Sequence, residues 1–190
     1  AGIPSFVGML PDALKNFLKR IPIDNWNPGD CIITNDPWIG SGHLPDVTMA
    51  APIFHKGKLV GFSGSIAHLP DIGGGGWSSD GRELFEEGIR ITPMKFLKEG
   101  EPNQDVFDFI TANVRVPSQV IGDIYAQVTA QQVCAERLRE FLDDAELADL
   151  SGLSSALLER ADIAMRKAIE VVPDGTYRSV LDADGFDEDE

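Results

Sequence analysis

Two copies of one tetrapeptide carry the residues best suited to chemistry in this chain. His-Leu-Pro-Asp stands at residues 43–46 and again at residues 68–71, so an imidazole precedes a carboxylate by three residues in both places. Neutral imidazole nitrogens and carboxylate oxygens bind zinc, manganese or iron without a thiolate. His43, Asp46 and His68 therefore form a candidate set of ligands for a divalent metal, with an open position for a reacting water or carbonyl group.

Two further carboxylates complete the candidate catalytic set. Asp71, the acid of the second tetrapeptide, is expected to be a fourth ligand or to support one of the other ligands. Asp36 follows Asn35 and is either the acceptor of a local turn or a carboxylate that orients a ligand histidine. The third histidine, His55, falls at a predicted turn, where we expect it to be exposed and without a role. The structural alternative for the tetrapeptides is a pair of turns in which Asp caps backbone amides and Pro ends a strand.

The segment between the tetrapeptides predicts a hairpin that brings them together. Residues 47–54 and 58–67 have the composition of two strands around a turn at Lys56-Gly57. A two-residue turn pairs Asp46 with Ala67, whereas a three-residue turn with a glycine bulge pairs it with His68. Either register leaves the two backbones one cross-strand step apart, ~4.5–5.5 Å between paired residues. The face that each side chain occupies depends on this register, which the sequence leaves open.

The remaining pattern predicts an α+β fold, in which an antiparallel hairpin or sheet carries the metal motifs and packs with two long C-terminal helices. We expect helices near residues 10–20, 104–114, 117–141 and 145–172, and short strands at residues 31–34, 89–93 and 176–181. The glycine run at residues 73–76 is either a lid or a close approach of the backbone to a ligand, or a plain flexible connector.

A single domain of residues 1–190 is expected. Residues 1–100 would supply mainly strands, loops and the metal site, residues 101–175 helices, and residues 176–190 the start of a further strand or an acidic tail. Because the chain begins without Met and ends in acids, we expect it to be a fragment of a longer protein.

The composition excludes several classes of partner. A formal charge of −15 argues against nucleic acid and anionic membrane surfaces, which favour Lys and Arg. No apolar run reaches the ~20 residues that span a bilayer. Two cysteines make no disulfide framework, which favours a reduced, cytoplasmic protein, and Cys31 in an apolar strand is expected to be inert.

Several motifs together resemble those of one known family, the hydantoinase B/oxoprolinase family, which includes the metal-bearing subunit of acetone-type carboxylases. The motifs lie along nearly the whole chain: Pro28-Gly29-Asp30, Asn35-Asp36-Pro37-Trp38, Gly42-His43-Leu44-Pro45-Asp46-Val47, Ala67-His68, Asp71-Ile72-Gly73-Gly74, Glu83-Leu84-Phe85-Glu86-Glu87-Gly88-Ile89-Arg90-Ile91, Ala112-Asn113-Val114-Arg115, Gly122-Asp123, Ala126-Gln127 and Pro173-Asp174-Gly175-Thr176-Tyr177.

The resemblance implies a metal site and a partner. His43, Asp46 and His68 match the family's ligands, and the metal is manganese, zinc or iron depending on the enzyme. A further ligand Asp of the family lies upstream of the position where this chain starts, and Leu69 stands where members often carry His or Trp. Family subunits are also longer, so the resemblance implies that this fragment alone is inactive.

The resemblance also implies a reaction. A hydantoinase A-type partner subunit or domain binds ATP and activates a cyclic amide such as a hydantoin or 5-oxoproline, and the metal-bearing subunit hydrolyses it within a hetero-oligomer. The absence of a GxxxxGK[ST] loop from this chain fits that division. The alternatives are the metal-bearing subunit of an ATP-dependent ketone carboxylase and a non-catalytic interaction module.

Overall fold

The structure is a computed structural model that describes residues 6, 8–40, 42–75 and 81–182. The chain divides into two compact units, residues 1–150 and residues 151–190. The first unit contains all the candidate site residues. None of the described helices is long and apolar enough to cross a membrane.

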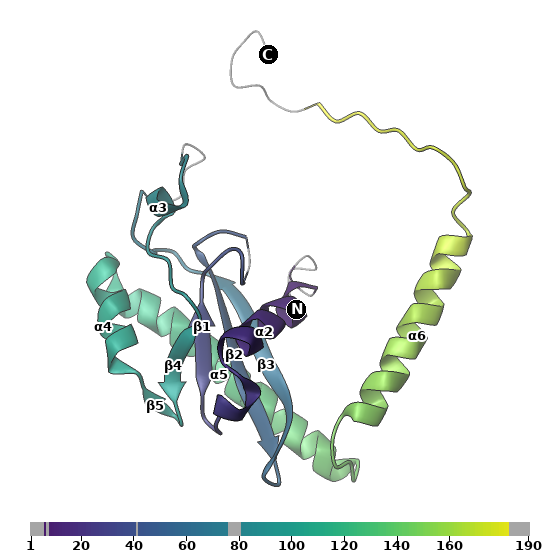
Figure 1. The fold of residues 1–190 in the computed structure, drawn as a ribbon, viewed down its shortest axis with the longest axis horizontal. Coiled ribbons are helices and arrows are strands. Elements are labelled where there is room, and N and C mark those ends of the chain that lie inside the picture. The colour runs from purple at the N-terminus through teal and green to yellow at the C-terminus, as the bar shows by residue number, and fades with distance from the viewer. Residues whose placement is uncertain (1–5, 7, 41, 76–80, 183–190) are drawn as a thin grey trace. The chain divides into compact units, whose positions relative to one another are not determined.

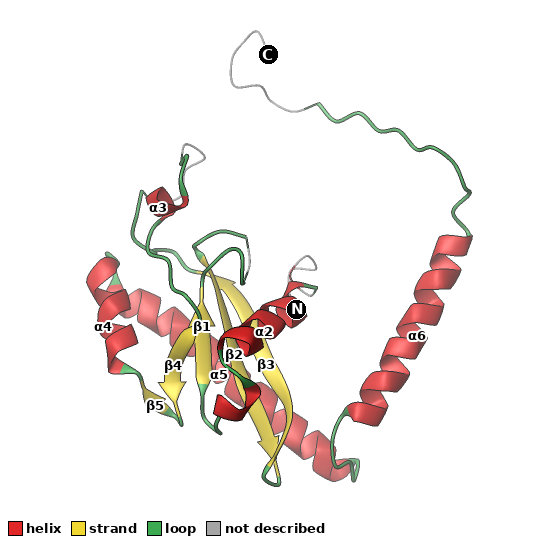
Figure 2. Cartoon of the chain, viewed as in Figure 1, coloured by secondary structure: helices red, strands yellow, loops and turns green. Residues whose placement is uncertain are grey.

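A five-stranded sheet forms the centre of the first unit (Figure 2). The spatial order is β3-β2-β1-β4-β5, and every neighbouring pair is antiparallel. The strands are β1 (Cys31–Thr34), β2 (Asp46–His55), β3 (Lys58–His68), β4 (Met94–Lys98) and β5 (Glu101–Pro102).

Helices cover both faces of this sheet, with α2 (Met9–Arg20) on one side and α4 (Gln104–Asn113) and α5 (Pro117–Asp144) on the other (Figure 1). Successive side chains of a strand point to opposite faces. Accordingly, Ile32 packs in a core cluster with residues of α2, and Ile33 packs in a second cluster with residues of α4 and α5. The α+β class with helices packed on an antiparallel sheet is confirmed.

The β2–β3 hairpin uses both of the registers that the sequence allowed. Lys56 and Gly57 have φ values of 48° and 80°, which suit a two-residue turn with both central residues in the left-handed region. The ladder starts with His55 opposite Lys58 and Phe54 opposite Leu59. It then shifts by one residue, with Val60 as the extra residue of a bulge, and continues to the end of the hairpin. This shift places Asp46 directly opposite His68.

The strand predicted at residues 89–93 was wrong, because β4 begins only at Met94. The backbone of residues 89–91 forms hydrogen bonds with the side chain of Asn35 and is not part of a ladder between strands. Its Oδ1 accepts the Ile91 amide at 2.6 Å and its Nδ2 donates to the Ile89 carbonyl at 2.9 Å. A side-chain amide thus satisfies backbone groups that a ladder would otherwise pair.

The second unit contains the helix α6 (Ser151–Glu170). It lies within the predicted helix at residues 145–172 and begins six residues later than predicted. The strand predicted at residues 176–181 was also wrong, since these residues have no regular secondary structure and are exposed. A strand needs a hydrogen-bonded neighbour, and the described residues of this unit offer none. The acidic end, residues 183–190, lies outside the described residues.

Candidate metal centre

The base of the β2–β3 hairpin brings together the three predicted ligands. Asp46 is the first residue of β2 and His68 is the last residue of β3. His43 lies in the turn before β2, where its carbonyl accepts the amide of Asp46 at 3.0 Å. Proline at position 45 suits this turn, because it has no N–H for the sheet to pair.

The ligand atoms of these residues form a nearly equilateral triangle. His43 Nε2 lies 3.2 Å from His68 Nδ1, and His68 Nδ1 lies 3.2 Å from Asp46 Oδ1. The third side, from His43 Nε2 to Asp46 Oδ1, is 3.4 Å. The Asp46 side chain is 9% exposed, whereas the imidazoles are 37% and 36% exposed. The carboxylate therefore forms the floor of a site that opens toward solvent between two rings.

These distances fit a shared cation. Two ligand atoms each about 2.1 Å from a tetrahedral zinc ion lie about 3.4 Å apart, close to the three sides observed. Two imidazole nitrogens and one carboxylate oxygen also suit manganese or iron. His43, Asp46 and His68 can therefore hold a metal ion among the described residues.

The loop that carries His43 is held by residues that the sequence analysis did not single out for this role. The Leu44 amide donates to Glu87 Oε2 at 2.9 Å, and the Leu44 carbonyl accepts Asn35 Nδ2 at 2.9 Å. The Leu44 side chain is fully buried in the core. Leu44 is thus held by its amide, its carbonyl and its side chain, and this fixes the position of the neighbouring ligand His43. The family motifs contained Asn35 and Glu87, but no local pattern indicates which backbone group each of them binds.

Gly42 allows Asp46 to approach the loop closely. Its φ is +51°, and a Cβ atom at this position would lie 2.7 Å from Asp46 Oδ2. A side chain at residue 42 would therefore strike the carboxylate that forms the floor of the site.

Asp71 is not brought into the cluster. Its carboxylate accepts the amides of Gly73 (3.0 Å), Val116 (3.3 Å) and Arg115, and it forms an ion pair with Arg115 Nη1 at 3.0 Å. Burial acts to raise the pKa of Asp71, but the backbone N–H groups of these three residues and the Arg115 side chain hold it below its usual value. The structure thus places Asp71 as the link between the loop after β3 and the start of α5.

Asp36 is likewise separate from the three ligands. Its Oδ2 accepts Arg90 Nε at 2.9 Å and Arg90 Nη2 at 2.5 Å, and its Oδ1 accepts the Trp38 amide at 3.1 Å. The last of these bonds is the local turn that the sequence offered as one reading of Asp36. The Arg90 guanidinium also lies over the Trp38 ring, 5.5 Å from its centroid.

His55 was expected to be exposed, and this was wrong. The side chain is 5% exposed, and its Nε2 lies 3.3 Å from Asp143 Oδ1 without hydrogen-bond geometry. Lys56 pairs with the same carboxylate oxygen at 2.7 Å. Contact between the hairpin tip and the end of α5 covers the imidazole.

The described part of the glycine run, residues 73–75, packs closely against another segment of the chain. Gly74 has a φ of +62°, and a Cβ atom there would lie 2.5 Å from the Glu86 carbonyl oxygen. This contact packs the loop after β3 against α3 (Leu84–Glu87). Gly76 lies outside the described residues.

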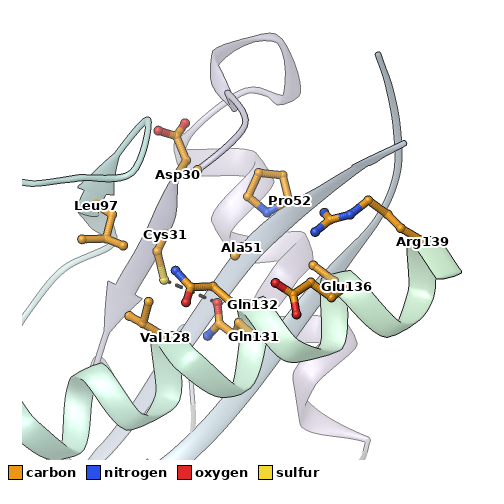
Figure 3. A pocket seen from close by; sticks show the side chains of 12 residues that line it. Asp30, Cys31, Ala51, Pro52, Leu97, Val128, Gln131, Gln132, Glu136 and Arg139 are labelled. Carbon is orange, nitrogen blue, oxygen red and sulfur yellow. Dashed lines mark hydrogen bonds between the residues drawn. The ribbon is translucent and has the colours of Figure 1, made fainter. Parts of the chain in front are cut away.

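A cavity of about 470 Å³ lies away from His43 and His68, between the start of β1, the end of β2 and α5 (Figure 3). Three of its polar lining residues, Asp30, Cys31 and Gln131, have partners. Cys31 donates to Gln131 Oε1 at 3.4 Å, and the Asp30 carboxylate, which points away from them in Figure 3, pairs with Lys95 at 2.6 Å. Burial, with the charge of Asp30, raises the pKa of Cys31 to about 12, which agrees with the expectation of an inert thiol. We therefore take the histidine cluster, and not this cavity, as the candidate site, because its three side chains can bind a metal ion.

Comparison with known protein families identifies the family of this chain. The model of the hydantoinase B/oxoprolinase family matches residues 1–188, and the chain belongs to this family.

Two relatives and one crystal structure show the extent of the similarity. The chain is 35% identical to the caprolactamase subunit beta of Pseudomonas jessenii, over 92% of the chain and 30% of that subunit. It is 29% identical to the 5-oxoprolinase of Dictyostelium discoideum, over 86% of the chain and 13% of that enzyme. The crystal structure of an ATP-dependent caprolactamase from Pseudomonas jessenii matches with a TM-score of 0.83 and 33% identity, over 94% of the chain and 31% of that structure's chain. The chain therefore spans less than a third of the length of each of these relatives.

Proposed function

We propose that this chain is the metal-bearing part of a longer hydantoinase B-type subunit in a metal-dependent, ATP-coupled enzyme that hydrolyses a cyclic amide. The observation that carries the proposal is the triangle of His43 Nε2, Asp46 Oδ1 and His68 Nδ1, with sides of 3.2 to 3.4 Å. Support comes from relatives whose names specify a lactam and 5-oxoproline, both cyclic amides. A hydantoin is a further candidate substrate of this class.

Residues of this chain would bind the metal ion and exclude water from one side of it. His43, Asp46 and His68 would hold a zinc, manganese or iron ion, which when bound would polarise a carbonyl group and activate water at neutral pH. Asp46 would supply the negative charge that attracts the cation, and the neutral imidazoles would supply nitrogen lone pairs. Leu44 and Leu69, which are 0% and 1% exposed, exclude water from beneath the ligands.

ATP is assigned to a partner subunit or domain of the hydantoinase A type. The sequence contains no GxxxxGK[ST] motif, and the subunit beta name of the caprolactamase relative supports a complex of different subunits. The proposed role for Asp71 and Asp36 is to support the site from outside the ligand set. Both carboxylates already bind arginine and backbone amides.

Metal content tests the proposal directly. In the complete protein, purified with its partner, we expect stoichiometric metal by elemental analysis. His43→Ala and His68→Ala should each weaken metal binding by more than about 100-fold, beyond the 10- to 100-fold loss typical of supporting partners. Hydrolysis of the cyclic amide should be lost with the metal.

His55→Gln is the matched control, because it removes the histidine that lies outside the cluster. It should leave the metal content unchanged. A metal-free complete protein whose activity survives His68→Ala would show that the tetrapeptides are structural turns of an interaction module. Bicarbonate-dependent ATP turnover with a ketone would instead assign the protein to the carboxylase branch.

A further inference from the structure

A second cavity, about 260 Å³, lies directly beside the proposed metal ligand His68. It is somewhat smaller than the pockets that bind drug-sized ligands, and therefore suits a small ring. Much of its wall is apolar and comes from Pro45, Leu69, Pro70, Ile72 and Val116. The polar side chains of the wall, besides His68, are Asp71, Glu87 and Arg115.

Arg115 is fixed at the wall by one side of its guanidinium group. Nη1 donates to Asp71 Oδ1 at 3.0 Å and to the Gly73 carbonyl at 3.4 Å, and Nη2 donates to the Gly74 carbonyl. A guanidinium has five N–H donors. The Nε–H group and the second hydrogen of Nη2 therefore have no acceptor among the described residues, and the side chain is 63% exposed.

The two carboxylates of the wall are already engaged. Asp71 accepts three backbone amides and Arg115, and Glu87 Oε2 accepts the amide of Leu44. Arg115 is the cationic side chain of this cavity. In a chain with a formal charge of −15, a fixed cation with unused donors beside a metal site favours a ligand that carries an oxyanion.

We infer that this cavity is the substrate pocket, and that Arg115 binds an oxyanion group of the bound ring through Nε–H and Nη2–H. These two donors match the two oxygens of a carboxylate or phosphoryl group, a geometry that lysine cannot reproduce. The oxyanion is either a carboxylate substituent of the ring or the phosphoryl group of an ATP-activated ring. The apolar part of the ring packs against Pro45, Pro70 and Val116. This assignment rests on the proposed function for its substrate class.

The experiment compares Arg115→Gln and Arg115→Lys in the complete, metal-loaded protein with its partner. The substrates are 5-oxoproline, which carries a ring carboxylate, and unsubstituted hydantoin, and equilibrium binding of 5-oxoproline and inorganic phosphate is measured separately. If Arg115 binds the ring carboxylate, Arg115→Gln raises KM and Kd for 5-oxoproline by about 10- to 100-fold. The KM for hydantoin, which has no ring carboxylate, then stays unchanged. If the phosphoryl group is bound, turnover of both substrates falls and the affinity for phosphate drops by a similar factor.

Arg137→Gln is the control, because Arg137 is an exposed arginine of α5 that pairs with Glu140 away from the cavity. Arg115→Lys should show a smaller loss than Arg115→Gln, and it decides the question if the glutamine variant does not fold. Metal content and melting temperature report any purely structural effect.

The inference is overturned if neither probe binds the wild-type protein, or if binding and KM in the Arg115 variants stay within twofold of Arg137→Gln. It is also overturned if Arg115→Gln loses metal while its affinity for both probes is unchanged. Absence of metal from the wild-type protein would contradict the proposed function instead, and both probes can still be titrated against that metal-free protein.

Discussion

The Asp46 carboxylate lies beneath two imidazoles, whereas the Asp71 carboxylate, from an identical tetrapeptide, binds backbone amides and an arginine. The residue types of the two tetrapeptides are the same, so side-chain chemistry alone does not distinguish them. The neighbours decide: Asp46 begins a strand opposite His68, and Asp71 lies beyond the strand end, next to Arg115. The position of the backbone therefore decides which of the two aspartates can act as a metal ligand.

Gly42→Ala should disturb the site without removing a ligand. The left-handed φ costs a non-glycine residue about 1–3 kcal/mol, and the new methyl group would meet the Asp46 carboxylate. We expect a lower melting temperature and weaker metal binding, measured by thermal unfolding and metal titration.

Gly122→Ala provides the comparison, because residue 122 lies within α5 and a Cβ atom there meets no heavy atom within 4 Å. Alanine at that position should stabilise the helix by up to about 1 kcal/mol and leave metal binding intact. Equal metal affinity in both variants would contradict the close approach at Gly42.

The hairpin is the element that aligns the site, and its bulge sets the alignment. With a ladder that stayed in the register of the turn, Asp46 would face Ala67; the shift at Val60 makes it face His68. Since side chains alternate between faces, this one-residue difference decides which residues share a face with Asp46. The loop after the hairpin is then attached to α5 through Asp71.

Asp71→Asn should weaken this attachment in a pH-dependent way. Because the pKa of Asp71 is lowered in the folded protein, its ionised form stabilises the fold above the usual carboxyl pKa of ~3.9, and this contribution is lost as the pH falls below that value. We expect the variant to be less stable at pH 7 by about 1–3 kcal/mol. The difference from wild type should shrink below pH 4 in denaturant titrations; a difference that stays constant from pH 7 to pH 3 would argue against an ionised Asp71 as the link.

The first unit as a whole is a sheet enclosed by helices on both faces, with the histidine cluster and the larger cavity near opposite ends of β2. The core on the α4 and α5 side includes Leu44 and Leu69, the second residues of the two tetrapeptides. The site is therefore continuous with the main hydrophobic core, and loss of that core should release the ligands.

Cys31 offers a probe of this packing. It is 2% exposed beneath α5, and burial raises its pKa to about 12, so a maleimide should not modify it in the folded protein at pH 8. Cys134, which is exposed on α5, should react within minutes and serves as the internal control. Peptide mass mapping should find Cys31 modified only in denaturant, and equal labelling of both thiols under native conditions would contradict the packed arrangement.

Local sequence was sufficient for much of this description. The alternation and breakers around residues 31–34 and 47–67 predicted β1 and the hairpin, and the turn at Lys56-Gly57 needed only its own residues. The same two tetrapeptides suggested His43, Asp46 and His68. The strand predicted at residues 89–93 failed because Asn35, more than fifty positions earlier, binds that backbone.

The sequence by itself determined which residue types could bind a metal and that a hairpin would bring them near one another, because turn chemistry and side-chain alternation are properties of neighbouring residues. Only the tertiary structure decided that Asp46 and not Asp71 joins the imidazoles, and that Glu87, Asn35 and Arg115 hold the loops around them. Those choices depend on a bulge and on hydrogen bonds between distant segments, and such bonds form only once packing has placed their partners within about 3 Å.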